Sequence, residues 1–95
     1  MIAREGNELR VRGALNIANV AALAEAGKQQ LGDGGELVVD LGEVTEVDSA
    51  ALSLVFEWQR EARRRKIKIS FRNLPASLKS LAALYGVSEL IAGYA

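Results

Sequence analysis

The sequence contains neither cysteine nor histidine among its 95 residues. Their absence excludes thiol nucleophiles, disulfides, zinc sites of the Cys/His type and imidazole acid–base catalysis. An excess of charge of one sign is also lacking, since 12 basic residues balance 12 acidic ones. This neutrality argues against a nucleic-acid binder that works through bulk charge, which normally carries a net basic face. No apolar run approaches the roughly 18–20 residues of a membrane span, and the start has no apolar signal region.

What remains is an ordinary globular composition, with 49% apolar and 25% charged residues. Such a composition supports a folded core and is unlike that of a disordered chain. The length fits one domain, so we expect residues 1–95 to form a single domain. Because cysteine is absent and no membrane span is found, we expect a cytoplasmic protein.

The hydrophobic periodicity predicts an α/β domain. Ile67, Ile69 and Phe71 alternate with polar residues as in a half-buried strand, whereas Val20, Leu23 and later apolar positions recur at helical spacing. The predicted order is ββαβαβα, which gives a four-stranded mixed sheet with helices packed against it and parallel strands at each β-α-β step. The predicted elements cover about residues 2–4, 9–12, 20–31, 37–39, 50–65, 67–71 and 75–85.

Local signals predict the ends of several elements. Gly6-Asn7 predicts the turn of a β-hairpin between the first two strands, and the glycine-rich residues 32–35 predict a turn after the first helix. Gly86 is predicted as the left-handed cap of the last helix, with Val87 as its apolar partner. Asp40 is interpreted as a carboxylate at a strand end that bonds loop amides.

The segment from Val38 to Leu52 is the most informative for function. It indicates a buried strand, a short loop, the acid–hydroxyl pair Asp48–Ser49 and the start of a helix. At a helix N-terminus the Ser49 hydroxyl lies near unsatisfied amides, where an anion or phosphate is tolerated. A second interpretation makes Asp48 and Ser49 simple caps, each worth about 1 kcal/mol. The residues alone favour the capping interpretation.

The pair at Asp48–Ser49 resembles that of the STAS (sulfate transporter and anti-sigma-factor antagonist) domain family, and the resemblance extends over nearly the whole chain. Within this family, Trp58, the segment Phe71–Pro75 and the segment Leu84–Val87 are most similar to the MlaB-type STAS subunits. The resemblance implies a non-enzymatic accessory subunit, without cofactor or metal. Its partner would be the cytoplasmic ATPase of an Mla-type phospholipid-transporting ABC complex, with membrane association only through that complex. It also implies that Ser49 faces the partner.

The predicted helix from Ala50 to Arg65 adds two apolar candidates. Winding at about 100° per residue places Ala51, Leu52, Val55, Phe56, Gln59 and Ala62 on the core side, with Ser53 in the solvent. Leu54 and Trp58 fall on the edge between the two sides. They are either exposed anchors of an interface, which could also support a weak homodimer, or packed on a neighbouring helix. The candidate partner-binding residues are Asp48, Ser49, Ser53, Leu54 and Trp58.

An anti-sigma-factor antagonist is the alternative function, with Ser49 as its phosphorylation site. Phosphorylated members of that class resemble Asp-Ser-Ser-Gly-Leu at this place, whereas Ala50-Ala51-Leu52 follows Ser49 here. The missing glycine weakens the phosphorylation hypothesis, because no glycine eases the approach of a kinase backbone. The basic run from Arg63 to Lys66 is interpreted as a solvated helix end that could meet an acidic patch on a partner.

Overall fold

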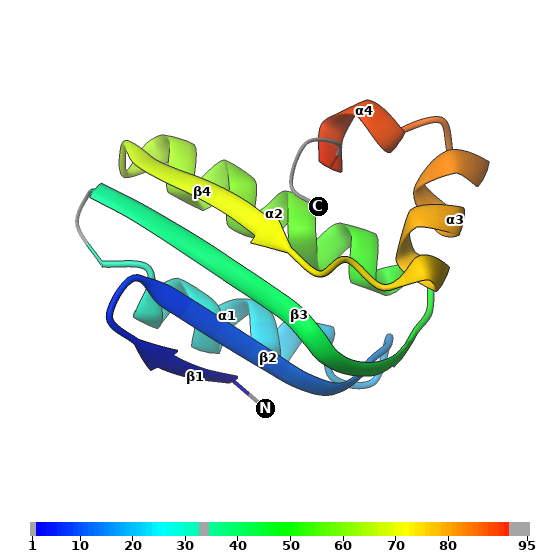
Figure 1. Ribbon diagram of the computed structural model, residues 1–95, viewed down its shortest axis with the longest axis horizontal. Helices are drawn as coiled ribbons and strands as arrows, with labels where there is room; N and C mark the ends of the chain where they lie inside the picture. Colours follow the sequence, from blue (N-terminus) through cyan, green and yellow to red (C-terminus); the bar gives the residue numbers. More distant parts are fainter. Residues whose placement is uncertain (1, 33–34, 92–95) are drawn as a thin grey trace.

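Four strands form one mixed sheet in the order β1-β2-β3-β4, which confirms the predicted fold class (Figure 1). A computed structural model describes residues 2–32 and 35–91. The turn predicted around residues 32–35 includes Asp33 and Gly34, which lie outside the described residues. The elements are β1 (Ile2–Glu5), β2 (Glu8–Leu15), α1 (Val20–Gln30), β3 (Gly35–Val47), α2 (Ala50–Arg64), β4 (Ile67–Arg72), α3 (Ala76–Leu84) and α4 (Ser88–Ile91).

The pairing of the strands follows the predicted hairpin and crossovers. β1 and β2 are antiparallel, while β2 with β3 and β3 with β4 are parallel. Leu9 lies opposite Val39, which in turn lies opposite Phe71, so one row of apolar side chains crosses three strands. β3 is much longer than the three residues predicted. It continues past Gly42 beside β2, so that its last residue brings the chain directly to the start of α2.

The core lies between the sheet and the helices α1 and α2, which run behind the sheet in Figure 1. Trp58 of α2 is fully buried, and its indole Nε1 donates a hydrogen bond to the carbonyl oxygen of Ala24 at 3.1 Å. Gly27 of α1 is buried against the same ring, where a Cβ atom would overlap the indole. The two helices therefore approach closely because a glycine faces a tryptophan.

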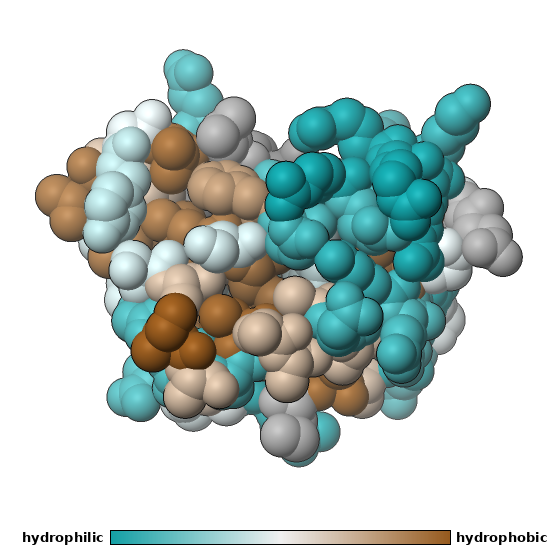
Figure 2. All heavy atoms as spheres, turned by 180° about the vertical axis from the view of Figure 1, so that it is seen from behind, coloured by the Kyte–Doolittle hydropathy of each residue, from teal (hydrophilic) through white to brown (hydrophobic). Residues whose placement is uncertain are grey.

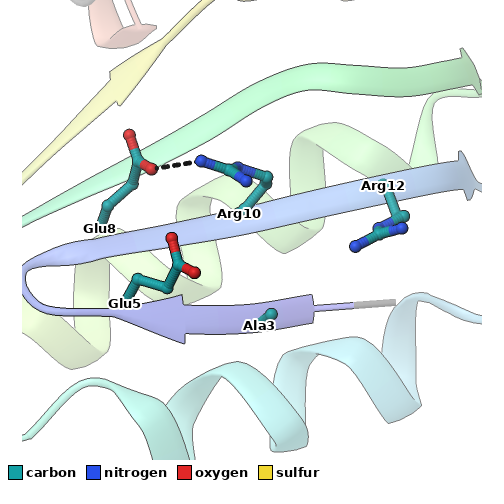
Figure 3. Close-up of a pocket in the computed structure, with 5 residues that line it drawn as sticks. All are labelled: Ala3, Glu5, Glu8, Arg10 and Arg12. Carbon is teal, nitrogen blue, oxygen red and sulfur yellow. Dashed lines mark hydrogen bonds and ion pairs between the residues drawn. The ribbon is translucent and has the colours of Figure 1, made fainter.

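Charged side chains occupy the other face of the sheet. Figure 3 shows Glu8 and Arg10 of β2 side by side, with an ion pair of 2.9 Å between them. Arg72 of β4 pairs with both Glu8 and Asp40 across β3. Asp40 also accepts a hydrogen bond of 2.8 Å from the Gly42 amide, which confirms the predicted role of this carboxylate at a loop. Successive side chains of a strand point to opposite faces of the sheet, so these polar residues alternate with the apolar residues that face the core.

The end of α3 follows the predicted cap. Gly86 has a φ of 72°, and the Val87 amide donates to the Ala82 carbonyl at 2.8 Å. This left-handed residue favours glycine because a Cβ atom is disfavoured there. Pro75 precedes the helix in an extended conformation, so α3 begins one residue later than predicted. Among the described residues, no helix has both the length and the apolar content needed to cross a membrane.

Candidate functional site at the start of helix α2

Asp48 is the residue that caps α2. One carboxylate oxygen accepts a hydrogen bond of 2.8 Å from the Ala50 amide, and the other accepts one of 3.1 Å from the Ile17 amide. The Asp48 amide in turn donates to the Leu15 carbonyl at 3.1 Å. Both oxygens are thus engaged in holding the backbone, and Asp48 joins the start of α2 to the loop between β2 and α1.

Ser49 follows Asp48 and is exposed. Its torsion angles are already helical, with φ −64° and ψ −20°, and its side chain makes no capping hydrogen bond. The reason is that Asp48 already supplies the oxygen that caps the first amide of the helix. The Ser49 hydroxyl is therefore displayed at the helix tip. The capping interpretation from the sequence applies to Asp48 and does not apply to Ser49.

Ile17 lies beside this tip and is 78% exposed. Its loop is held by Asn16 and Asn19. Asn19 accepts a hydrogen bond from the Asn16 amide at 3.0 Å and donates one to the Ala14 carbonyl at 2.7 Å. A large apolar side chain thus stands in solvent on a loop whose backbone is fixed by hydrogen bonds. Ile17 was not among the residues predicted from the sequence, although an isoleucine among turn-forming asparagines was a usable signal.

A shallow groove of about 210 Å³ runs between α1 and α2 next to this tip. Ser53 is exposed at its edge, one turn after Ser49, as predicted for the solvent side of the helix. We call the exposed tip together with this groove the α2-tip surface. It comprises Ile17, Ser49 and the groove residues Val20, Ala21, Ala24, Ser53, Leu54 and Glu57.

Leu54 and Trp58 do not form exposed anchors, so that interpretation is wrong. Their exposed fractions are 2% and 0%, because α1 covers this side of α2. The buried side of the helix is rotated toward them and away from Phe56 and Gln59, which are only half-buried. The packing alternative therefore describes both residues. Trp58 offers no exposed surface to a second copy of the chain, and the weak homodimer itself stays a prediction. Leu54 still contributes to the lining of the groove.

Ion pairs occupy the opposite end of α2. Arg64 and Arg65 hold the Glu61 carboxylate, and their hydrogen bonds lower its pKa to about 2. Glu57 pairs with Lys28 of α1 at 2.8 Å and with Arg60. The hydrogen bond from Lys28 is the largest cause that lowers the pKa of Glu57, and the same bond raises the pKa of Lys28. These groups keep their charges near neutral pH.

Figure 2 shows the helical side of the molecule. Apolar surface gathers over α3 and over the N-terminal halves of α1 and α2, while hydrophilic surface covers the C-terminal end of α2. Leu84 and Tyr85 at the end of α3 form an exposed apolar pair, 75% and 57% exposed. The described residues contain no group of three or more histidine, cysteine, aspartate or glutamate side chains placed to hold a metal.

Comparisons with known proteins agree with this fold. A family model described as MlaB, STAS domain, matches residues 1–92. The structure of the anti-sigma factor antagonist SpoIIAA in its unphosphorylated form is similar, with a TM-score of 0.72 and 14% identity over 94% of this chain and 82% of that chain. A structure of Mglu matches with a TM-score of 0.61 and 20% identity, over 80% of this chain and 19% of that one. No curated protein matches the sequence.

Proposed function

The chain belongs to the MlaB-type STAS domain family, and from this premise we propose that it is a non-enzymatic accessory subunit of an Mla-type phospholipid-transporting ABC complex. In this proposal it binds the cytoplasmic ATPase of the complex through the α2-tip surface. It reaches the inner membrane only through that complex, where it supports the maintenance of lipid asymmetry.

The exposed Ser49 hydroxyl carries the proposal. Asp48 caps the helix with a bond of 2.8 Å, so Ser49 is free of that task and stands at the tip of α2. An exposed hydroxyl that makes no capping hydrogen bond can donate a hydrogen bond to a partner or accept one from it without giving up a capping role. Such a group supports recognition of a polar or anionic element of the ATPase.

The apolar part of the α2-tip surface supports the same proposal. Ile17 is held in solvent by a loop that Asp48 and Asn19 fix, so little conformational entropy is lost when a partner covers it. The groove beside it has small alanine side chains, which leave room for an apolar side chain of the partner. A subunit bound there shifts the ATPase toward one arrangement only if it binds that arrangement more tightly.

Replacement of Ser49 by glutamate tests the proposal. The matched control is Ser70→Glu, which adds the same side chain on the polar face of the sheet, away from α1 and α2. We expect Ser49→Glu to weaken binding to the co-expressed Mla-type ATPase by at least tenfold, because a central contact is worth about 2 kcal/mol or more. Ser70→Glu should bind as the wild type does in the same size-exclusion and titration experiments.

The thermal unfolding midpoints of both variants should stay close to that of the wild type, because Ser49 is exposed and Ser70 lies half-buried on the polar face of an edge strand. Equal binding of the wild type and Ser49→Glu would remove the α2 tip from the interface. A failure of the wild type itself to bind the ATPase would contradict the proposed partner.

An anti-sigma-factor antagonist regulated by phosphorylation of Ser49 is the second candidate. The observation that favours it is again the exposed hydroxyl, which a kinase can reach, at a helix N-terminus that tolerates a phosphate. Alanines at 50 and 51 stand where the phosphorylated class has serine and glycine. Incubation with the kinase encoded beside such an antagonist, followed by intact mass, separates the two functions. A phosphate adduct that Ser49→Ala abolishes would support this candidate.

A further inference from the structure

The exposed side of α2 extends from the tip surface to a cluster of arginines. Ser49, Ser53, Arg60 and Arg64 recur at spacings that keep them on one line along the helix, and all four are exposed. Arg60 lies eleven positions after Ser49, which corresponds to about 17 Å along a helix that rises 1.5 Å per residue. The side that displays Ser49 is thus the side that displays the arginines.

This end of α2 carries an excess of positive charge. From residue 57 to residue 66 there are five cations and two carboxylates, although the chain as a whole is neutral. Glu57 and Glu61 are both already paired, with Arg60 and Arg64 respectively. Arg63 is exposed and makes none of the ion pairs found within the described residues. In Figure 2 this end forms the hydrophilic part of the helical side.

A stable interface at the tip of α2 is large enough to extend toward the other end of the helix. A typical interface covers about 800 Å² on each partner, which is a patch about 32 Å across. A patch centred on Ser49 therefore extends about 16 Å along the helix and ends close to Arg60. A partner that binds at the tip and follows α2 then comes next to the arginine cluster, here defined as Arg60, Arg63 and Arg64.

We infer that the ATPase bound at the α2 tip places an acidic segment opposite the arginine cluster. The inference rests on the proposed function and names the chemistry of the partner at one end of its contact. An uncharged or basic segment would leave the positive excess without a counter-charge, whereas an acidic one complements it. Complementary charges at the rim act chiefly on the rate of association and on its salt dependence.

Arg63→Glu tests the inference, because this change breaks none of the ion pairs of the described residues. The matched control is Lys68→Glu, which reverses one exposed charge on the polar face of β4. The measurement is the association rate constant with the purified Mla-type ATPase of the same genome. We expect Arg63→Glu to slow association about three- to tenfold at about 50 mM salt and less than twofold at about 500 mM. Lys68→Glu should stay within twofold of the wild type at both concentrations.

A second variant, Arg60→Gln with Arg64→Gln, keeps the helix-forming side chains and removes two charges. It should also slow association at low salt, with a thermal midpoint that shows it to be folded. If the wild type binds but Arg63→Glu and the double variant associate as fast as Lys68→Glu, the inference is overturned and the proposed function stands. If the wild type does not bind the ATPase, both are overturned.

The remaining alternative is that the arginine cluster binds an anionic membrane, and vesicles test it. Phosphatidylcholine vesicles with roughly 30% phosphatidylglycerol attract exposed cations, each worth about 1 kcal/mol near the surface. We expect the wild-type protein to sediment with these vesicles no more than the Lys68→Glu variant does. Sedimentation that Arg63→Glu abolishes, together with unchanged association with the ATPase, would assign the cluster to the membrane and overturn the inference.

Discussion

The two sides of α2 use different residue types for different tasks. The buried side holds Leu54 and Trp58 beneath α1, where a tryptophan faces a glycine. The exposed side begins with Ser49 and ends with arginines. The sequence leaves Trp58 either as an interface anchor or as packed on a neighbouring helix, and the tertiary structure assigns it to the core. A large aromatic residue is therefore informative about binding only after its burial is known.

Truncation of the buried side should have the largest effect. Trp58→Ala removes a fully buried indole and its hydrogen bond to Ala24, so we expect a loss of about 3–5 kcal/mol in the free energy of unfolding. Trp58→Phe keeps most of the volume and should lose about 1–2 kcal/mol. Equilibrium urea unfolding measures both. A loss below about 1 kcal/mol for Trp58→Ala would contradict the assignment of this side to the core.

Addition of a methyl group to the same contact should have the next largest effect. Gly27→Ala would overlap the Trp58 ring, and we expect a loss of about 1–3 kcal/mol even though alanine favours helix by about 1 kcal/mol. The control is the same change in a Trp58→Leu background, where the smaller side chain leaves room. The two changes should therefore be non-additive in a double-mutant cycle of unfolding free energies. Additive effects would mean that the glycine and the ring do not meet.

Asp48 lies at the junction of the two sides, and its replacement should have an intermediate effect on stability and also on ATPase binding. Asp48→Ala removes the cap at Ala50 and the bond to Ile17, with an expected cost of about 1–2 kcal/mol in unfolding free energy. Hydrogen exchange of the Ile17 and Ala50 amides should become faster, and ATPase binding should weaken because Ile17 is no longer held. Unchanged exchange at both amides would show that other groups fix this junction. Asp48→Asn keeps one acceptor and should be milder.

Glu61, near the C-terminal end of α2, should show the smallest effect, which is present near neutral pH and disappears in acid. Arg64 and Arg65 lower its pKa to about 2, below the ordinary value of 4.5. Because the folded pKa is lower, the contribution of Glu61 to stability is complete above pH 4.5 and is lost as the pH falls toward 2. The stability difference between wild type and Glu61→Gln should shrink over that window. Carboxyl titration by NMR with a midpoint near 4.5 would contradict the pairing.

Much of the fold could be predicted from local pattern. The alternation at Ile67, Ile69 and Phe71 and the cap at Gly86 are local properties, and the structure confirms them. The length of β3 could not be predicted, because pairing with β2 carries the strand through Gly42. The exposure of Ser53 followed from its place on the helix, whereas that of Ile17 depends on the distant Asp48 carboxylate.

The short helix α4 was not predicted, but the sequence alone was enough to predict the order of the elements from β1 to α3, the start of α2 at Asp48–Ser49 and the resemblance to the STAS family. These depend on residues close together in the chain, where periodicity and capping act. Only the tertiary structure decided which side of α2 is buried, because α1 covers Trp58 through Gly27 from 31 positions away. It also decided that Asp48 is the cap and Ser49 is displayed, since one carboxylate satisfies both the helix and a distant loop.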